Sequence, residues 1–154
     1  MDVGRSLNPA VDIGQIEGAF MQGVGLFTME EELYSTKGVL LTCGPGAYKI
    51  PGFRDIPSKF RVSLYDEWSN RHGLYHSKAV GEPPLFMGSS VFFAIRDAIK
   101  SSFSSNSVLE FHSPATVENI RMSLNDTYAL NVSYQSSSLC LSLSFQGIKF
   151  YTSN

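Results

Sequence analysis

The chain has 154 residues, of which 43% are hydrophobic and 17% are charged, a composition typical of one globular domain with its own core. Its net charge of -2 and its scattered single lysines and arginines argue against nucleic acid as a partner. Cys43 and Cys140 lie far apart, with no cysteine or histidine nearby at metal-ligand spacing. Neither a zinc site nor a disulfide framework is predicted, and a reducing compartment is favoured.

Membrane attachment is not predicted either. The N-terminus carries charges at Asp2 and Arg5 and lacks the apolar core of a signal peptide. The apolar run over residues 85–95 is too short to span a bilayer. We therefore expect a soluble cytoplasmic protein without a membrane partner, and leave a peroxisomal location open.

The first predicted element is a helix near residues 13–28, where apolar residues recur at helical spacing and Asp12 can serve as N-cap. Glycines interrupt this pattern, each at a cost of about 1 kcal/mol relative to alanine; they are Gly14, Gly18, Gly23 and Gly25. Close packing against another helix or sheet is one explanation, and close approach of a bulky ligand is the other. Gln15 places an amide with two donors and one acceptor near this face.

Short strands are predicted in the middle of the chain. Residues 39–42 form an apolar run that is followed by the turn residues 43–46. Residues 60–65 alternate between apolar and polar, as in a half-buried strand. Together with the helices, these runs predict an α+β fold.

The stretch KAVGEPPLF over residues 78–86 holds one carboxylate between a glycine and two prolines. Pro83 disfavours a helical backbone at Glu82, which predicts an extended conformation there, and Gly81 can adopt angles closed to other residues. Proline suits the first turn of a helix, so we expect a helix near residues 84–103. Its apolar stripe consists of Leu85, Phe86, Val91, Phe92, Ile95 and Ile99.

Glu82 at the entrance to this helix has two interpretations. It can complement the positive end of the helix dipole, or it can be a reacting group. Local chemistry alone favours the dipole by roughly two to one, because functional carboxylates are the minority.

The C-terminal part is predicted to contain one more helix. Ser113 and Pro114 fit an N-cap and a first-turn proline, which places a short helix near residues 114–124. The serine- and leucine-rich tail that follows reads either as strands or as unpacked sequence.

Four stretches carry a family resemblance: MDVGRSLNPAVDIGQIEGAFMQGVGLFTMEE, GPGAYKIPGF, SKAVGEPPLF and SPATVENIR. Taken together, residues 1–124 resemble the C-terminal part of the molybdenum-cofactor domain of xanthine dehydrogenase and xanthine oxidase. The resemblance implies a partial molybdopterin-binding domain with about three helices and several short strands. Residues 125–154 form a divergent tail. Aldehyde oxidases usually lack the double proline, so Glu82-Pro83-Pro84 favours the xanthine branch.

The resemblance also implies roles for individual residues. Glu82 matches the family's catalytic glutamate, a general base toward a hydroxide ligand on molybdenum in the oxidation of hypoxanthine and xanthine toward urate. Gln15 matches a glutamine near the molybdenum ligands and the pterin. Gly14 and Gly81 are candidates for shaping the cofactor pocket, and no side chain is expected to bind the metal directly.

Several parts of such an enzyme are not in these 154 residues. The family is homodimeric and also has iron-sulfur clusters, FAD and an earlier half of the cofactor domain. We therefore expect an isolated chain that is inactive and exposes apolar surface. The alternatives are a non-catalytic packing or dimerisation domain and a fragment of an aldehyde oxidase-like enzyme.

Overall fold

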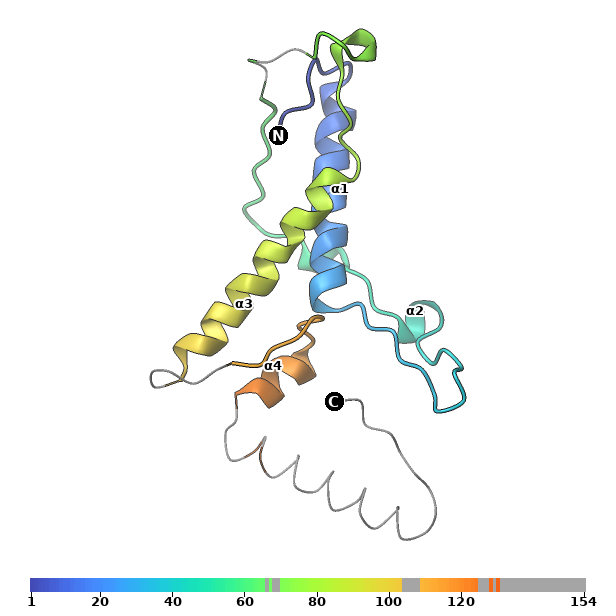
Figure 1. Ribbon diagram of the computed structural model, residues 1–154, viewed down its shortest axis with the longest axis vertical. Coiled ribbons are helices and arrows are strands. Elements are labelled where there is room, and N and C mark those ends of the chain that lie inside the picture. The colour runs from blue at the N-terminus through green and yellow to red at the C-terminus, as the bar shows by residue number, and fades with distance from the viewer. Residues whose placement is uncertain (66, 68–69, 104–108, 125–127, 129, 131–154) are drawn as a thin grey trace.

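The computed structural model describes residues 1–65, 67, 70–103, 109–124, 128 and 130 (Figure 1). The longest element is helix α1 (Pro9–Thr28). Helix α3 (Ser89–Ser101) starts beside α1 and diverges from it. Helix α4 (Val117–Ser123) lies near the C-terminal end of α1. The shorter elements are α2 (Gly44–Ala47) and three 3₁₀ turns, η1 (Phe53–Asp55), η2 (Leu74–His76) and η3 (Pro83–Gly88).

Helix α1 confirms the first predicted helix but begins four residues earlier. Asn8 is the N-cap, and its Oδ1 accepts a hydrogen bond from the backbone of Val11 at 3.4 Å. Pro9 occupies the first helical position, which requires no backbone donor. Asp12, the predicted cap, lies inside the helix and accepts a hydrogen bond from the Ser6 hydroxyl at 2.5 Å.

The predicted strands are wrong, and the described residues form only isolated bridges. Leu41 donates to the carbonyl of Leu33 at 2.7 Å, which closes a local turn without building a sheet. In the run over residues 60–65 only Tyr65 forms a bridge, with Asp2. Alternation predicts a half-buried extended segment, but a sheet also requires neighbouring strands along its length. The described part is therefore mostly helical, not α+β.

The predicted long helix is divided into the 3₁₀ turn η3 and the α-helix α3. Ile99 on α3 is buried with Phe111 and Ala115, and Phe92 stacks on Phe111 with ring centroids 5.2 Å apart. Phe86, expected in the same stripe, is 73% exposed. Because a 3₁₀ turn has three residues per turn, the helical stripe does not extend back through η3.

The third predicted helix is confirmed as α4, although its predicted start is wrong. Thr116 is the N-cap, and its Oγ1 accepts from the backbone of Asn119 at 3.2 Å. The Ser113-Pro114 peptide bond is cis and precedes the helix. Ala115 donates to the carbonyl of Phe27 at 2.8 Å, which ties this region to the end of α1. The predicted tail, residues 125–154, lies outside the described residues except for 128 and 130.

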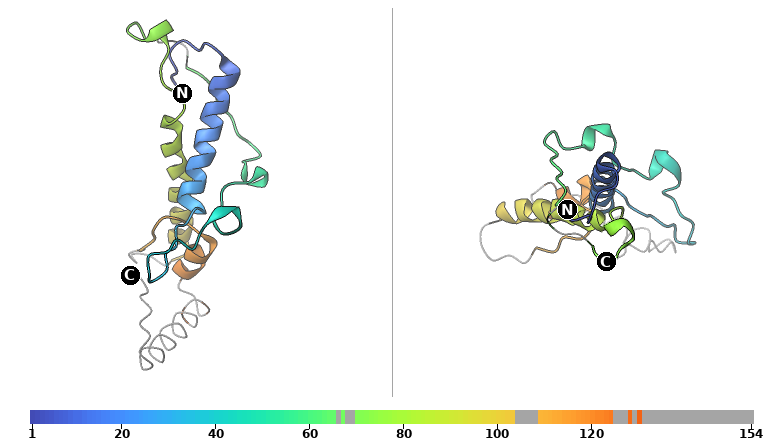
Figure 2. Two further views of the ribbon diagram at one scale, coloured as in Figure 1. Left: turned by 90° about the vertical axis from the view of Figure 1, so that its right-hand side faces the viewer. Right: turned by 90° about the horizontal axis from the view of Figure 1, so that it is seen from above.

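Helix α1 packs mainly along η3 and less against α3. Figure 2 shows, in the view from above, that α3 leads away from α1. Gly23 and Gly88 are buried where the elements meet. A Cβ atom on Gly88 would lie 2.7 Å from the Cα of Gly23. Close packing therefore explains Gly23. A Cβ atom on Gly14 or Gly18 would have no neighbour within 4 Å among the described residues.

Candidate functional site

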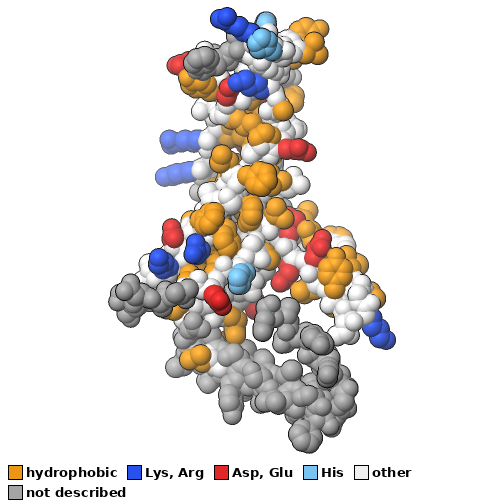
Figure 3. Space-filling model, in the orientation of Figure 1, with side chains coloured by type: hydrophobic (Ala, Val, Ile, Leu, Met, Phe, Trp, Pro, Cys, Tyr) orange, Lys and Arg blue, Asp and Glu red, His pale blue; other side chains and the backbone are white. Residues whose placement is uncertain are grey.

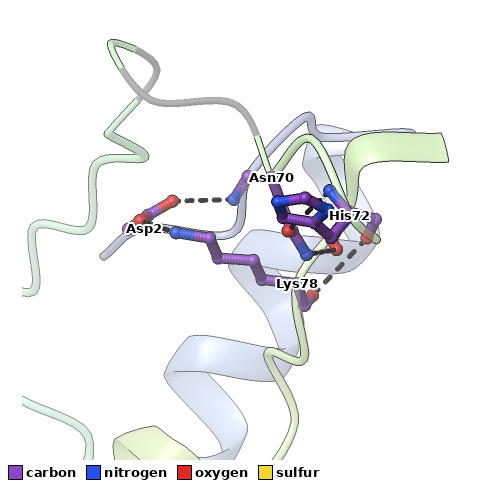
Figure 4. A network of polar contacts seen from close by, with 6 residues as sticks. Asp2, Asn70, His72 and Lys78 are labelled. Atoms are coloured by element: carbon purple, nitrogen blue, oxygen red, sulfur yellow. Dashed lines mark hydrogen bonds and ion pairs between the residues drawn. The ribbon is translucent and has the colours of Figure 1, made fainter. Parts of the chain in front are cut away.

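The segment that leads to Glu82 is held by the N-terminus of the chain. Lys78 donates its backbone N–H to the carbonyl of Val3 at 2.8 Å, and Arg5 donates to the carbonyl of His76 at 2.9 Å. Val3 between these bonds is only 2% exposed. The Lys78 ammonium also forms an ion pair with Asp2 (Figure 4). The hydrogen bond from Lys78 lowers the pKa of Asp2, and a second bond from the Gly4 backbone adds to this shift.

A polar turn next to this ion pair is organised by Asn70. The Asn70 amide donates to the carbonyl of Ser77 at 3.0 Å, and its Oδ1 accepts from the backbone of His72 at 3.3 Å. Nδ1 of His76 lies 3.1 Å from the carbonyl of Asn70. Figure 4 shows these contacts beside Lys78. They stabilise the turn that precedes the KAVGEPPLF segment.

Glu82 occupies the N-cap position of η3, at φ -100° and ψ -35°. The predicted extended conformation is therefore wrong. The carbonyl of Glu82 accepts a hydrogen bond from Leu85 at 3.0 Å, which closes the first 3₁₀ turn. A following proline disfavours this backbone but does not forbid it. The carboxylate of Glu82 makes no capping hydrogen bond within the described turn and is exposed.

Gln15 and Gly81 are brought together across the site. A Cβ atom on Gly81 would lie 3.2 Å from Oε1 of Gln15, closer than ordinary van der Waals contact. Gly81 does not have positive φ, so it matters here because it has no side chain. Gln15 is exposed on α1, and it lies next to the residue that precedes Glu82. Gly14 is exposed on α1, and no described contact joins it to this group.

A concavity of about 450 Å³ lies beside Glu82. It is lined by Ala79, Gly81, Glu82, Pro83 and Phe86. Phe86 was assigned to the helix stripe, and its place in this lining was missed. The available signal was its spacing from Pro83, because residues three apart eclipse each other in a 3₁₀ turn. A second concavity of about 490 Å³ shares Pro83 and is bounded by Ile16, Phe20 and Phe60.

The arrangement fits one side of a bulky, heteroatom-rich group. Gly81 has no side chain and so lets the Gln15 amide, which can donate and accept hydrogen bonds, lie close to the backbone next to Glu82. Glu82 adds an exposed carboxylate at the edge of the concavity. Among the described residues no group of three or more histidine, cysteine, aspartate or glutamate side chains could hold a metal ion. No helix in the described part is long and apolar enough to cross a bilayer.

Comparison with known proteins identifies the class. Residues 1–57 match the family model of the molybdopterin cofactor-binding domain. The structure also resembles quinoline 2-oxidoreductase from Pseudomonas putida 86, with a TM-score of 0.67 and 26% sequence identity. That likeness covers 81% of this chain and 15% of the other. The chain is therefore a segment of a molybdopterin-binding domain.

Two curated relatives identify the family. Xanthine dehydrogenase from Calliphora vicina is 58% identical over 131 residues, and xanthine dehydrogenase/oxidase from Gallus gallus is 60% identical over 131 residues. Each match covers 83% of this chain and 10% of the relative. The chain belongs to the xanthine dehydrogenase/oxidase family and spans about a tenth of the length of these relatives. The resemblance seen in the sequence is confirmed.

Proposed function

We propose that the chain is the segment of a xanthine dehydrogenase-like molybdenum hydroxylase that supplies the general base, Glu82. The observation that carries this proposal is the place of the carboxylate. It is exposed at the edge of a concavity, makes no capping hydrogen bond, and follows the glycine that contacts Gln15. A glutamate that only complemented the helix dipole would require neither the concavity nor the nearby Gln15.

The proposed substrates are hypoxanthine and xanthine, oxidised toward urate with oxygen from water. Molybdenum-molybdopterin, when bound, would supply the two-electron oxidation by taking up the hydrogen that leaves the purine carbon with its electron pair. An Oε atom of Glu82 takes the proton from the attacking oxygen as this oxygen bonds to the electron-poor purine carbon. A positioned base of this kind contributes roughly 10²- to 10⁴-fold to a rate. The amide of Gln15 orients the cofactor by hydrogen bonding, Gly81 shapes the pocket by letting this amide lie close to Glu82, and Gly14 leaves space for the cofactor.

The remaining functions of the enzyme belong outside these residues. We place the iron-sulfur clusters, FAD and the rest of the cofactor and substrate site in other parts of a longer homodimeric protein. The large difference in length between this chain and its relatives supports that assignment.

A non-catalytic packing or dimerisation domain is the second candidate, favoured by the many exposed apolar side chains. The upstream transcript distinguishes the two. Cysteine motifs for iron-sulfur clusters in the same reading frame support the enzyme, and an independent promoter with a start codon at Met1 supports the packing domain.

The direct test replaces the matching segment of the Gallus gallus enzyme with residues 1–124 and then changes Glu82→Ala. We expect kcat for xanthine to fall by roughly 10²- to 10⁴-fold while the molybdenum content stays unchanged, because the base acts in the chemical step. Steady-state kinetics and metal analysis measure both quantities.

Glu118→Ala is the matched control, because Glu118 is also an exposed carboxylate in the first turn of a helix. It should leave turnover unchanged. Near-normal turnover of Glu82→Ala would remove Glu82 from the mechanism.

A further inference from the structure

We infer that Gly23 and Gly88 form a backbone contact that positions Glu82 beside Gln15. We call it the glycine contact. This inference rests on the proposed function, since it gives the contact a purpose in the reaction of Glu82. Both residues act as positioning residues and have no part in the chemistry.

The glycine contact is one of two close approaches that glycines allow between α1 and residues 81–88. Gln15 and Gly81 meet at one end, and Gly23 and Gly88 meet at the other. Residue numbers increase along both segments from the Gln15–Gly81 end to the Gly23–Gly88 end, so the two segments are parallel. From Gln15 to Gly23, α1 rises about 12 Å at 1.5 Å per residue. The seven steps from Gly81 to Gly88, most of them within η3, span a similar length, about 14 Å at 2.0 Å per residue. The two contacts together therefore fix how η3 lies along α1.

Element η3 is stiff enough that a displacement of Gly88 also moves Glu82. Pro83 and Pro84 have restricted backbone angles, and Leu85 bonds back to the Glu82 carbonyl at 3.0 Å. At the other end, the Ser89 hydroxyl donates to the carbonyl of Phe86 at 2.6 Å. These constraints leave the turn few ways to bend, so a shift at its end moves the carboxylate.

Only glycine allows this approach. A Cβ atom on Gly88 would lie 2.5 Å from the backbone nitrogen of Val24, and one on Gly23 would lie 2.9 Å from the carbonyl carbon of Leu85. Backbone atoms cannot rotate aside as the end of a side chain can, so α1 and η3 would have to separate. A displacement of about 1 Å in a catalytic group can reduce a rate by 10²-fold.

The test is a double-mutant cycle in the same Gallus gallus chimera, with Gly88→Ala, Glu82→Ala and both together. We expect Gly88→Ala to lower kcat by about 10²-fold with a nearly unchanged KM and molybdenum content. The double variant should be no slower than Glu82→Ala, because Gly88 acts through Glu82. Gly46→Ala is the matched control, since a Cβ atom there would have no neighbour within 4 Å among the described residues.

Three results would contradict the inference or the function beneath it. If the Gly88→Ala effect persists in full in the Glu82→Ala background, the contact serves the fold in general, and the inference fails. It also fails if Gly88→Ala leaves kcat unchanged while Glu82→Ala abolishes it. If Glu82→Ala itself is fully active, the proposed function fails first.

A second variant covers the case in which Gly88→Ala does not fold. In Gly81→Ala the new Cβ atom meets only the flexible end of Gln15, so the backbone can stay in place. This variant should lower kcat without adding to the effect of Glu82→Ala, and an unchanged kcat would overturn the inference that the contacts of α1 with residues 81–88 position Glu82. In the 154-residue chain, Gly88→Ala should also speed amide hydrogen exchange at Leu85, and Gly46→Ala should not.

Discussion

Lys78 and Asp2 form an ion pair at the start of the segment that leads to Glu82. The hydrogen bond from Lys78 holds the pKa of Asp2 below its ordinary value of 3.8. A carboxyl group with a lowered pKa stabilises the folded state above its unfolded pKa. This contribution is lost as the pH falls through the lowered pKa of the folded state. Acid should therefore loosen the N-terminal segment.

Replacing the cation should remove much of this pH dependence. In Lys78→Met we expect the pKa of Asp2 to rise toward its ordinary value. The stability of the variant should then change less than that of the parent between about pH 6 and pH 2. Carbon-detected NMR titration of Asp2 and urea unfolding at each pH measure the two effects. Lys37→Met, at an exposed loop lysine, is the control, and an unmoved Asp2 pKa in Lys78→Met would contradict the assignment.

At the residue scale, the sequence singled out Glu82, whose role stays a prediction, and misjudged its backbone. Glu82 was singled out because a carboxylate before two prolines belongs to a specific motif. Its backbone was predicted wrongly, because the hydrogen bond from Leu85 opposes the local steric preference. The contact between Gln15 and Gly81 joins residues far apart in the chain, and no local rule could have predicted it.

At the element scale, the glycines of α1 divide into two kinds. Gly23 is buried against η3, whereas a Cβ atom on Gly18 would have no neighbour within 4 Å in the described part of the chain. Glycine lowers the stability of a helix in both places, but only Gly23 is required by its neighbours. The periodicity of the sequence predicted the helix and could not separate these two kinds.

Alanine substitution should therefore have opposite effects at the two positions. In the 154-residue chain we expect Gly18→Ala to raise the free energy of unfolding by up to about 1 kcal/mol through helix propensity. Gly23→Ala should lower it by about 1–3 kcal/mol or more through overpacking. Denaturant unfolding with unchanged m-values measures both. Equal effects at the two positions would contradict the packing described for Gly23.

The two predicted strands do not form in the described part of the chain, and the reason also concerns whole elements. Residues 39–42 have the apolar composition of a strand and residues 60–65 have its alternation, and each run contributes one bridge residue, Leu40 and Tyr65. A strand forms when a partner lies along it, and within the described residues only single bridges form. Local pattern thus predicted the three helices, which satisfy their own backbone groups, and failed for elements whose partners must come from elsewhere.

At the scale of the whole molecule, the described chain exposes much apolar surface. In Figure 3 hydrophobic side chains follow the middle of the visible face, with most charged groups toward its edges. Phe53 is 90% exposed and Leu74 is 84% exposed. Contiguous exposed apolar surface marks places where other protein packs. This agrees with a segment that spans a tenth of the length of its relatives.

An isolated chain of this kind should not hold the cofactor. We expect the purified 154-residue protein to retain no molybdopterin and to show no hydroxylation of xanthine, because one side of a pocket buries too little of the ligand. Metal analysis and a urate assay measure the two properties. The chimeric enzyme purified in parallel is the positive control. Stoichiometric molybdenum in the isolated chain would show that its residues are sufficient for binding.

The contact between Gly23 and Gly88 also has a consequence during synthesis. The two residues are 65 positions apart, and ribosomes add about 5–20 residues per second. Helix α1 therefore leaves the ribosome roughly 3–13 s before the turn that covers it. During that time the face of α1 that carries Gly23 is exposed to chaperones and to neighbouring nascent chains. The close backbone packing that covers Gly23 in the finished fold is therefore absent while the chain is being made.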